Sequence, residues 1–126
     1  MKSVLVDTSV WVAHFRQPDP HLITLLTQDR VMLHPLIVGE IACGTPPRRQ
    51  QTLADLESLR PVKQASLGEA LDFIEREQLY GLGVGLVDLL LLTSAMLTQQ
   101  VELWTLDKRL AELALRFGLR HQPAVH

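Results

Sequence analysis

The sequence contains a single cysteine, Cys43, which excludes an internal disulfide framework. A lone cysteine is typical of a reducing compartment, so we expect the protein in the cytoplasm. No targeting segment is expected, because Asp7 interrupts the only apolar stretch near the amino terminus before a signal-peptide core could form. Cys43 itself is most simply interpreted as a small buried hydrophobe.

The sequence also lacks an apolar run that could cross a membrane, and it lacks an excess of positive charge. Its most apolar stretch, residues 86–97, contains Asp88 and is shorter than the roughly 18 residues that a span requires. We interpret it as a buried helix. The formal net charge is -2, whereas a dedicated DNA-binding domain is usually basic. Any contact with nucleic acid must therefore use a local basic patch or a metal ion.

What the sequence does contain is an alternation of short apolar runs and helical patterns. Strands are predicted at residues 4–6, 31–33 and 101–105, with a weak one at Val62. Helices are predicted at residues 10–15, 20–28, 36–41, 48–59, 67–79, 86–98 and 108–117, and a short final strand or tail after Gly118. This alternation predicts the α/β class with a mostly parallel sheet. The length and the absence of repeats and linkers predict one domain, residues 1–126.

The stretch of residues 2–15 carries the clearest strand and the clearest junction between a strand and a helix. Residues 4–6 form a continuous apolar run, which is typical of a central parallel strand covered on both faces. Asp7, Thr8 and Ser9 follow, and these residue types often cap helices. Asp7 is therefore predicted at the carboxyl end of a central strand, the edge at which open α/β sheets bind ligands.

Four acidic residues occupy comparable places in this pattern. They lie just after strands or in the helices that follow, and they are Asp7, Glu40, Asp88 and Asp107. Each of the three aspartates could instead be a helix cap, a common role of Asp at such junctions. Glu40 is expected on the apolar side of its helix, where a carboxylate is seldom buried without a partner.

A parallel sheet brings the carboxyl ends of its strands to one edge, so we expect these four acids to converge. Converging carboxylates repel one another, and they either take up protons or hold a cation. Hard oxygen ligands suit Mg²⁺ or Mn²⁺, and no His and Cys spacing in the sequence suggests zinc. The chemistry that uses such a site is hydrolysis of a phosphodiester, in which the metal binds the scissile phosphate and activates a water molecule.

Four segments together carry a resemblance to a known family. They are VLVDTSVWV, HPLIVGEIACG, GLVDLLLLTSAM and LWTLDKRLAELA, and in their order and spacing they cover almost the whole chain. The segments resemble the PIN-domain ribonucleases, and most closely the VapC toxins of bacterial type II toxin-antitoxin pairs. The resemblance implies a three-layer α/β/α sandwich with a mostly parallel central sheet.

The resemblance also implies roles for individual residues. By position, Asp7, Glu40 and Asp88 are similar to the catalytic metal ligands of the family. Asp107 is similar to its fourth catalytic acid, which serves the metal through water. The hydroxyl residues that would orient the acids or the water are Thr8, Ser9 and Thr105.

For function, the resemblance implies an endoribonuclease that depends on Mg²⁺ or Mn²⁺ and cuts structured RNA such as tRNA or rRNA. It implies a cognate VapB-like antitoxin that covers the site, and we expect that antitoxin to bind with an apolar segment in a groove near the helices that follow the first two strands. We also expect a homodimer. Two alternatives stay open: an RNA-processing PIN nuclease that is not a toxin, and a non-catalytic module such as a phospho-acceptor receiver. A receiver needs an acceptor Asp after its middle strand, whereas this chain has Lys63 and Gln64 there.

The remaining polar features have two interpretations each. Arg48 and Arg49, or Lys108 and Arg109 beside Asp107, could contact RNA phosphates or an acidic antitoxin. For the first pair, a solvated helix start is the simpler interpretation. The glycines of residues 80–85 lack the spacing and the preceding strand of a dinucleotide-binding loop, so turn chemistry accounts for them better.

Overall fold

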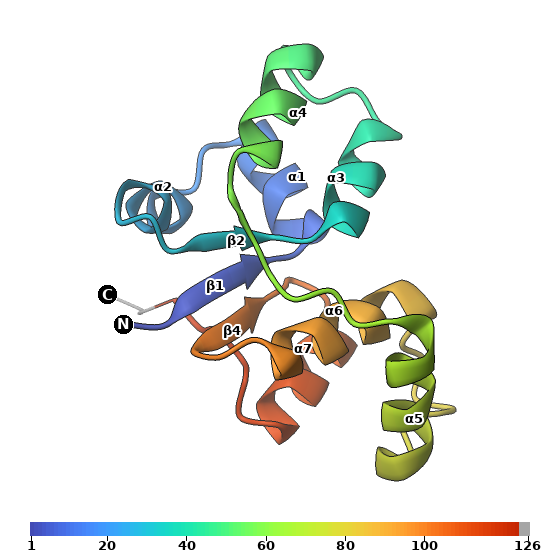
Figure 1. The fold of residues 1–126 in the computed structure, drawn as a ribbon. Coiled ribbons are helices and arrows are strands. Elements are labelled where there is room, and N and C mark those ends of the chain that lie inside the picture. Colours follow the sequence, from blue (N-terminus) through green and yellow to red (C-terminus); the bar gives the residue numbers. More distant parts are fainter. Residues whose placement is uncertain (124–126) are drawn as a thin grey trace.

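A computed structural model describes residues 1–123, in which four short strands form the centre of the protein (Figure 1). The strands are β1 (Ser3–Val6), β2 (Val31–Leu33), β3 (Arg60–Pro61) and β4 (Val101–Trp104). Their order across the sheet is β3-β2-β1-β4, and every pair of neighbours is parallel. The predicted α/β class with a parallel sheet is confirmed.

Helices cover both faces of this sheet. They are α1 (Thr8–Arg16), α2 (Pro20–Thr27), α3 (Pro35–Ala42), α4 (Arg49–Glu57), α5 (Leu67–Glu77), α6 (Leu86–Leu97) and α7 (Lys108–Arg116). In Figure 1, α1, α3 and α4 lie on one side of the sheet and α5, α6 and α7 on the other, which gives the three expected layers. None of the helices in residues 1–123 combines the length and the apolar character that crossing a membrane requires.

The path of the chain across the sheet reverses its direction once. From β1 the chain moves outward to β2 and then to β3, and it returns through α5 and α6 to β4, on the other side of β1. The carboxyl ends of β1 and β4 therefore flank a topological switch point, the place where open α/β sheets bind their ligands. Asp7 follows β1 and Thr105 follows β4, so both residues stand at this switch point.

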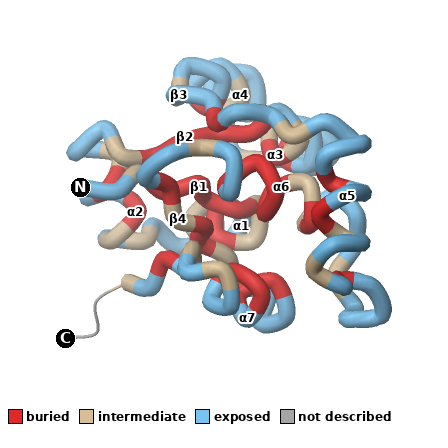
Figure 2. The backbone as a smooth tube through the Cα atoms, turned by 60° about the horizontal axis from the view of Figure 1, so that its bottom comes forward, coloured by how far each residue is buried: buried red, intermediate tan, exposed pale blue. Residues whose placement is uncertain are grey.

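β1 is the most deeply buried strand. Val4, Leu5 and Val6 have no exposed surface and belong to the core that Figure 2 shows in red. β1 pairs with β2 on one side and with β4 on the other, and helices cover both of its faces. A continuous apolar run is therefore required here, in place of the alternation of a half-exposed strand.

Two elements lie slightly away from their predicted positions. α4 begins at Arg49, because Arg48 has a left-handed backbone (φ 46°) and gives the helix no side-chain cap. The weak strand predicted at Val62 is β3, which ends just before Val62. It contains Pro61, which has no N–H to donate to a neighbouring strand. Val62 lies just beyond β3, and its N–H donates to Leu33 O over 2.9 Å.

Two expectations about burial are wrong. Cys43 is exposed, because it follows the last residue of α3 and lies outside the core. α6 is buried only in its middle, where Leu91 and Leu92 have no exposed surface. Leu86 and Met96, near its two ends, are 47% and 41% exposed, so the packed helices do not cover its full length.

The end of the described chain adds a single bridge to the free edge of β4. Arg120 pairs with Leu103, and the backbone of Leu103 bonds to Leu119 O and to the N–H of His121. The strand predicted after Gly118 is therefore reduced to one bridge. The predicted domain extends to residue 126, and residues 124–126 lie outside the described part of the chain.

Candidate active site

Asp7 lies at the carboxyl end of β1 and is held by two hydroxyl groups. Its Oδ2 accepts hydrogen bonds from Ser9 Oγ (2.7 Å) and from Thr105 Oγ1 (2.8 Å). Backbone N–H groups fix these hydroxyls in turn: Leu106 donates to Ser9 Oγ over 3.0 Å. Asp107 donates to Thr105 Oγ1 over 3.1 Å. We call these four bonds the Asp7 network, and it ties the end of β1 to the end of β4.

The alternative in which Asp7 is a helix cap does not hold. Asp7 occupies the position before the first residue of α1, yet its side chain accepts no hydrogen bond from a backbone N–H in the first turn of that helix. The carboxylate is directed across to β4 instead, and it is only 6% exposed. A buried carboxylate needs donors of this kind to offset its lost hydration.

The expectation that Glu40 lies on the apolar side of its helix is wrong. Glu40 is exposed, whereas Ile37 and Ile41 of the same helix are buried. It does have a partner, because Thr8 Oγ1 donates to Glu40 Oε1 over 2.7 Å. Thr8 directly follows Asp7, so this bond turns Glu40 toward the carboxyl end of β1.

Asp88 lies in the first turn of α6 and is partly buried. Its pKa is raised from 3.8 to about 6, chiefly by burial. Three neighbouring carboxylates add to the rise, in order of effect Asp7, Asp107 and Glu40. The structure therefore brings the four predicted acids within electrostatic range of one another.

Asp107 does cap its helix. Its Oδ1 accepts a hydrogen bond of 3.0 Å from the N–H of Leu110 in the first turn of α7. Its side chain is exposed, and its own N–H belongs to the Asp7 network. Asp107 is thus attached to the site through its main chain, while its carboxylate serves the helix.

The four acids present the oxygen donors that Mg²⁺ or Mn²⁺ prefers. Within residues 1–123, however, no three His, Cys, Asp or Glu side chains are gathered closely enough to enclose an ion. Two of the acids each use one carboxylate oxygen for a hydrogen bond to another group: Glu40 accepts from Thr8, and Asp107 accepts from the start of α7. The donor set thus fits a hard divalent cation in its chemistry, and closure around an ion would require these two carboxylates to exchange their present contacts.

The four basic residues predicted to contact RNA or a partner are exposed and occupy two separate places. Arg48 and Arg49 lie at the start of α4, where Arg49 Nη2 donates to Ala42 O over 2.7 Å. Lys108 and Arg109 form the first turn of α7. Only this second pair directly adjoins one of the four acids along the chain.

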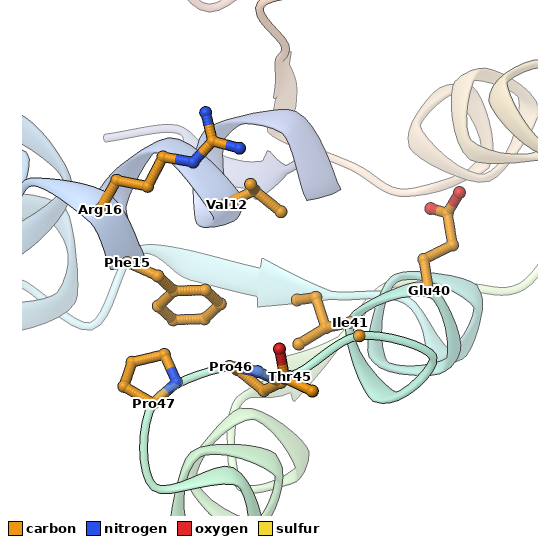
Figure 3. A pocket seen from close by; sticks show the side chains of 9 residues that line it. Val12, Phe15, Arg16, Glu40, Ile41, Thr45, Pro46 and Pro47 are labelled. Carbon is orange, nitrogen blue, oxygen red and sulfur yellow. The ribbon is translucent and has the colours of Figure 1, made fainter.

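A groove opens beside Glu40, near the helices that follow the first two strands, where we expected the antitoxin to bind (Figure 3). It has a volume of about 380 Å³ and lies between α1, α3 and residues 44–47. Its walls are largely apolar, with Val12 and Phe15 from α1 facing Ile41 from α3, and Arg16 and Glu40 also line it. The residues that line the groove were not predicted, because its walls meet only after the sheet has formed.

Comparison with known proteins shows a family and similar proteins. The PIN domain family model matches residues 4–115. Ribonuclease VapC32 of Mycobacterium tuberculosis, in strains CDC 1551 / Oshkosh and H37Rv, is 39% identical over 116 residues, which cover 92% of this chain and 94% of that protein. A crystal structure of DNA-bound VapBC from Salmonella typhimurium is similar with a TM-score of 0.64 and 15% identity, over 89% of this chain and 92% of that one. This last likeness speaks for the fold alone.

Replacement of Asp88 by Asn is expected to stabilise the metal-free protein. Neighbouring carboxylates disfavour the folded state, and Asp88→Asn removes one charge at nearly constant size. We expect the free energy of unfolding to rise by about 0.5 to 2 kcal/mol, as is usual when a functional site is relaxed. Thermal unfolding of both proteins in EDTA measures this. With saturating Mg²⁺ the difference should shrink or reverse, since the wild type is stabilised by mass action. An equal loss of stability in both conditions would make Asp88 a structural residue.

The raised pKa of Asp88 also predicts a pH dependence. Because its folded-state pKa of about 6 lies above the ordinary 3.8, protonation of this carboxyl stabilises the folded state. That contribution is complete below about pH 4 and is lost as the pH rises through about 6. In EDTA, the wild type should lose about 1 kcal/mol relative to Asp88→Asn across this range, a figure discounted because the carboxyl is partly exposed to water. Urea unfolding of both proteins at several pH values measures it, and parallel curves would contradict it.

Proposed function

The chain belongs to the PIN-domain family, and on that premise we propose that it is an endoribonuclease of the VapC kind, the toxin of a toxin-antitoxin pair. It hydrolyses phosphodiester bonds of RNA. The observation that carries the proposal is the proximity of the other three acids to Asp88, whose pKa is raised chiefly by burial and further by the charges of Asp7, Asp107 and Glu40. The identity to a VapC ribonuclease over most of both chains supports the same activity. The family match speaks against a receiver-like module.

We propose that Asp7, Glu40 and Asp88 hold a divalent cation, Mg²⁺ or Mn²⁺, and that Asp107 acts on it through a water molecule. When bound, such an ion neutralises charge on the scissile phosphate and lowers the pKa of the attacking water. The donor chemistry supports this assignment, because carboxylate oxygens are hard ligands and the described part of the site offers no soft ones.

The hydroxyl residues prepare these acids. Ser9 and Thr105 both bind Oδ2 of Asp7, so they fix the plane of the carboxylate and leave Oδ1 without a hydrogen bond from the described residues. Thr8 keeps Glu40 turned toward the site. Asp7 and Glu40 are therefore oriented by hydroxyl groups before any substrate arrives, which reduces the reorganisation that the reaction requires of these two acids.

The proposal extends to the setting of the protein. We propose one nuclease unit of residues 1–126, and the hydrophobic core that the described residues share supports it. We propose that it acts in the cytoplasm, which the lone cysteine supports. Its proposed substrate is structured RNA such as tRNA or rRNA. A homodimer would bury apolar side chains that the single chain leaves exposed on α5 and α6. These are Leu67, Leu71, Met96 and Leu97.

Cleavage should require a divalent metal, Asp7 and Glu40. Asp7→Asn and Glu40→Gln each remove a ligand charge without changing the size of the side chain, and we expect cutting to slow by at least about 100-fold. The assay is cleavage of total RNA and of isolated tRNA with Mg²⁺, with Mn²⁺ and with EDTA, with circular dichroism to verify folding. Glu112→Gln, at an exposed acid of α7, is the matched control and should cut normally.

Two results would contradict this prediction. Undiminished cutting in EDTA would exclude the metal, and a wild-type rate in one of the two variants would remove that residue from the site.

We propose that a VapB-like antitoxin binds in the groove of Figure 3. The groove offers apolar walls and ends at Glu40, so a bound segment could bury an apolar side chain and place a basic one among the acids. The solved structural relative is itself a VapBC complex, which supports a partner of the same kind. A neighbouring reading frame for a small protein with a DNA-binding amino-terminal half would identify the partner, and it would separate a toxin from an RNA-processing nuclease.

Substitution in the groove should weaken this complex. Val12 lines the groove and is 39% exposed, so Val12→Asp adds an unpaired charge where an apolar side chain is expected to bind. We expect the Kd for the antitoxin to rise at least about tenfold, measured by calorimetry. Leu115→Asp on α7, where Leu115 is 60% exposed, is the matched control. If only the control weakened the complex, the partner would bind the opposite side of the sheet.

A further inference from the structure

The loop between α5 and α6, residues 78–85, sets the position of Asp88. Leu79 is buried and Val84 packs against the core, so both ends of the loop are anchored. Between them, Tyr80 and Leu82 are 57% and 43% exposed and add little to this anchoring. The exposed middle of the loop, which leads into α6, therefore takes its support from contacts with other elements.

Gly83 is the residue of this exposed part that meets another element. A Cβ at Gly83 would overlap Nη1 of Arg109 and lie 2.8 Å from its Cζ, so the guanidinium fills the space that a side chain would need. Arg109 Nη1 also donates a long hydrogen bond of 3.4 Å to Gly83 O. Gly81 has a similar left-handed backbone (φ 70° against 75°), yet nothing lies within 4 Å of a Cβ placed there. Both glycines serve the turn, as predicted, but only Gly83 has this partner.

A second arginine of α7 holds the other end of the loop. Arg116 Nη2 donates to the carbonyl of Glu77, the last residue of α5, over 3.0 Å. Beside it, the rings of Phe73 and Phe117 lie 5.0 Å apart and join the same two helices. α7 thus holds the loop at both ends, and Arg109 acts at the end that leads into α6.

We propose that Arg109 is a positioning residue that fixes the start of α6 against the start of α7. Asp88 lies in the first turn of α6, and Asp107 directly precedes α7, so this contact sets the spacing between two of the acids. The inference rests on the proposed function, which gives those acids their role in binding metal. It also changes the interpretation of Arg109, whose side chain is engaged with the protein's own loop. Lys108, which forms no ion pair within the described chain, is the better phosphate contact of that turn.

The contact depends on the shape of the guanidinium more than on its charge. Because the hydrogen bond to Gly83 O is long, close packing against the bare glycine backbone carries most of the contact. A planar guanidinium can lie against that backbone and still donate to its carbonyl, whereas the tetrahedral ammonium of lysine cannot do both. Arg109→Lys keeps the positive charge that could attract RNA and removes the planar guanidinium that packs on Gly83. The variant therefore separates the positioning role from the electrostatic one.

The test uses two matched pairs of variants of the whole chain. Gly83→Ala and Gly81→Ala carry similar backbone penalties at positive φ, but only the first places a methyl group where Arg109 lies. Arg109→Lys keeps the charge of the turn, whereas Lys108→Gln removes one. Three quantities are measured: the rise in Tm with added Mn²⁺, the hydrogen exchange of residues 86–91 in EDTA, and kcat and KM for RNA cleavage.

Gly83→Ala and Arg109→Lys should weaken the apparent Mn²⁺ affinity about tenfold, the low end of the effect of residues that orient metal ligands. Both should speed exchange in residues 86–91 and lower kcat. Gly81→Ala should leave metal affinity and exchange within about twofold of the wild type. Lys108→Gln should do the same and mainly raise KM.

Equal behaviour of the two glycine variants would overturn the proposal, and so would wild-type metal affinity and exchange in Arg109→Lys. A wild-type protein that neither responds to Mn²⁺ nor cleaves RNA would instead refute the proposed function. Hydrogen exchange needs no metal, so it tests the positioning role of Arg109 even if the proposed function is refuted. Unchanged exchange in Gly83→Ala would overturn that role, and faster exchange would support it.

Discussion

The hydrogen bonds that hold the Asp7 carboxylate are the interaction on which the rest of the site depends. A carboxylate with 6% exposure at the end of a central strand has lost most of its hydration, at a cost of several kcal/mol unless donors replace it. Ser9 and Thr105 supply those donors, one from α1 and the other from the end of β4. The charge can therefore be kept only where β1 and β4 lie side by side, which is also the switch point of the sheet.

The acids divide into two pairs on either side of this network. Asp7 and Glu40 belong to the part of the chain that enters α1 and α3, and the hydroxyl of Thr8 joins them. Asp88 and Asp107 belong to the starts of α6 and α7, on the other face of the sheet in Figure 1. The bond between Thr105 and Asp7 links the two pairs, so the position of β4 affects all four acids. A site built in two halves also explains why the carboxylates can be in electrostatic range without yet enclosing an ion.

Sequence alone predicted the features that local chemistry decides. A short continuous apolar run such as residues 4–6 is typical of a strand covered on both faces, and the residues after it showed where that strand ends. The exposure of Glu40 and of Cys43 was not predicted, because helical spacing fixes the angle between side chains and not the neighbours that cover them. The partner of Arg109 was missed for a similar reason, since Gly83 lies on another element far away in the sequence. β3 was predicted only weakly, because it has two residues, one of them a proline, and is too short to show a strand pattern in the sequence.

Asp7 and Asp107 show how a long-range contact decides between two roles that look alike in the sequence. Each is an aspartate between a strand and a helix, and each has the extended backbone of a residue that precedes a helix. Asp107 comes shortly after β4, and in the described chain the outer edge of β4 pairs only through the single bridge to Arg120. The carboxylate of Asp107 accepts a hydrogen bond from its own helix. Asp7 lies at the end of a strand with neighbours on both sides. The hydroxyl groups of Thr105, just after β4, and of Ser9 bind its carboxylate, and no backbone N–H of its helix does. An aspartate at such a junction thus caps its helix by default, and it becomes available for chemistry where an adjacent strand supplies a competing donor.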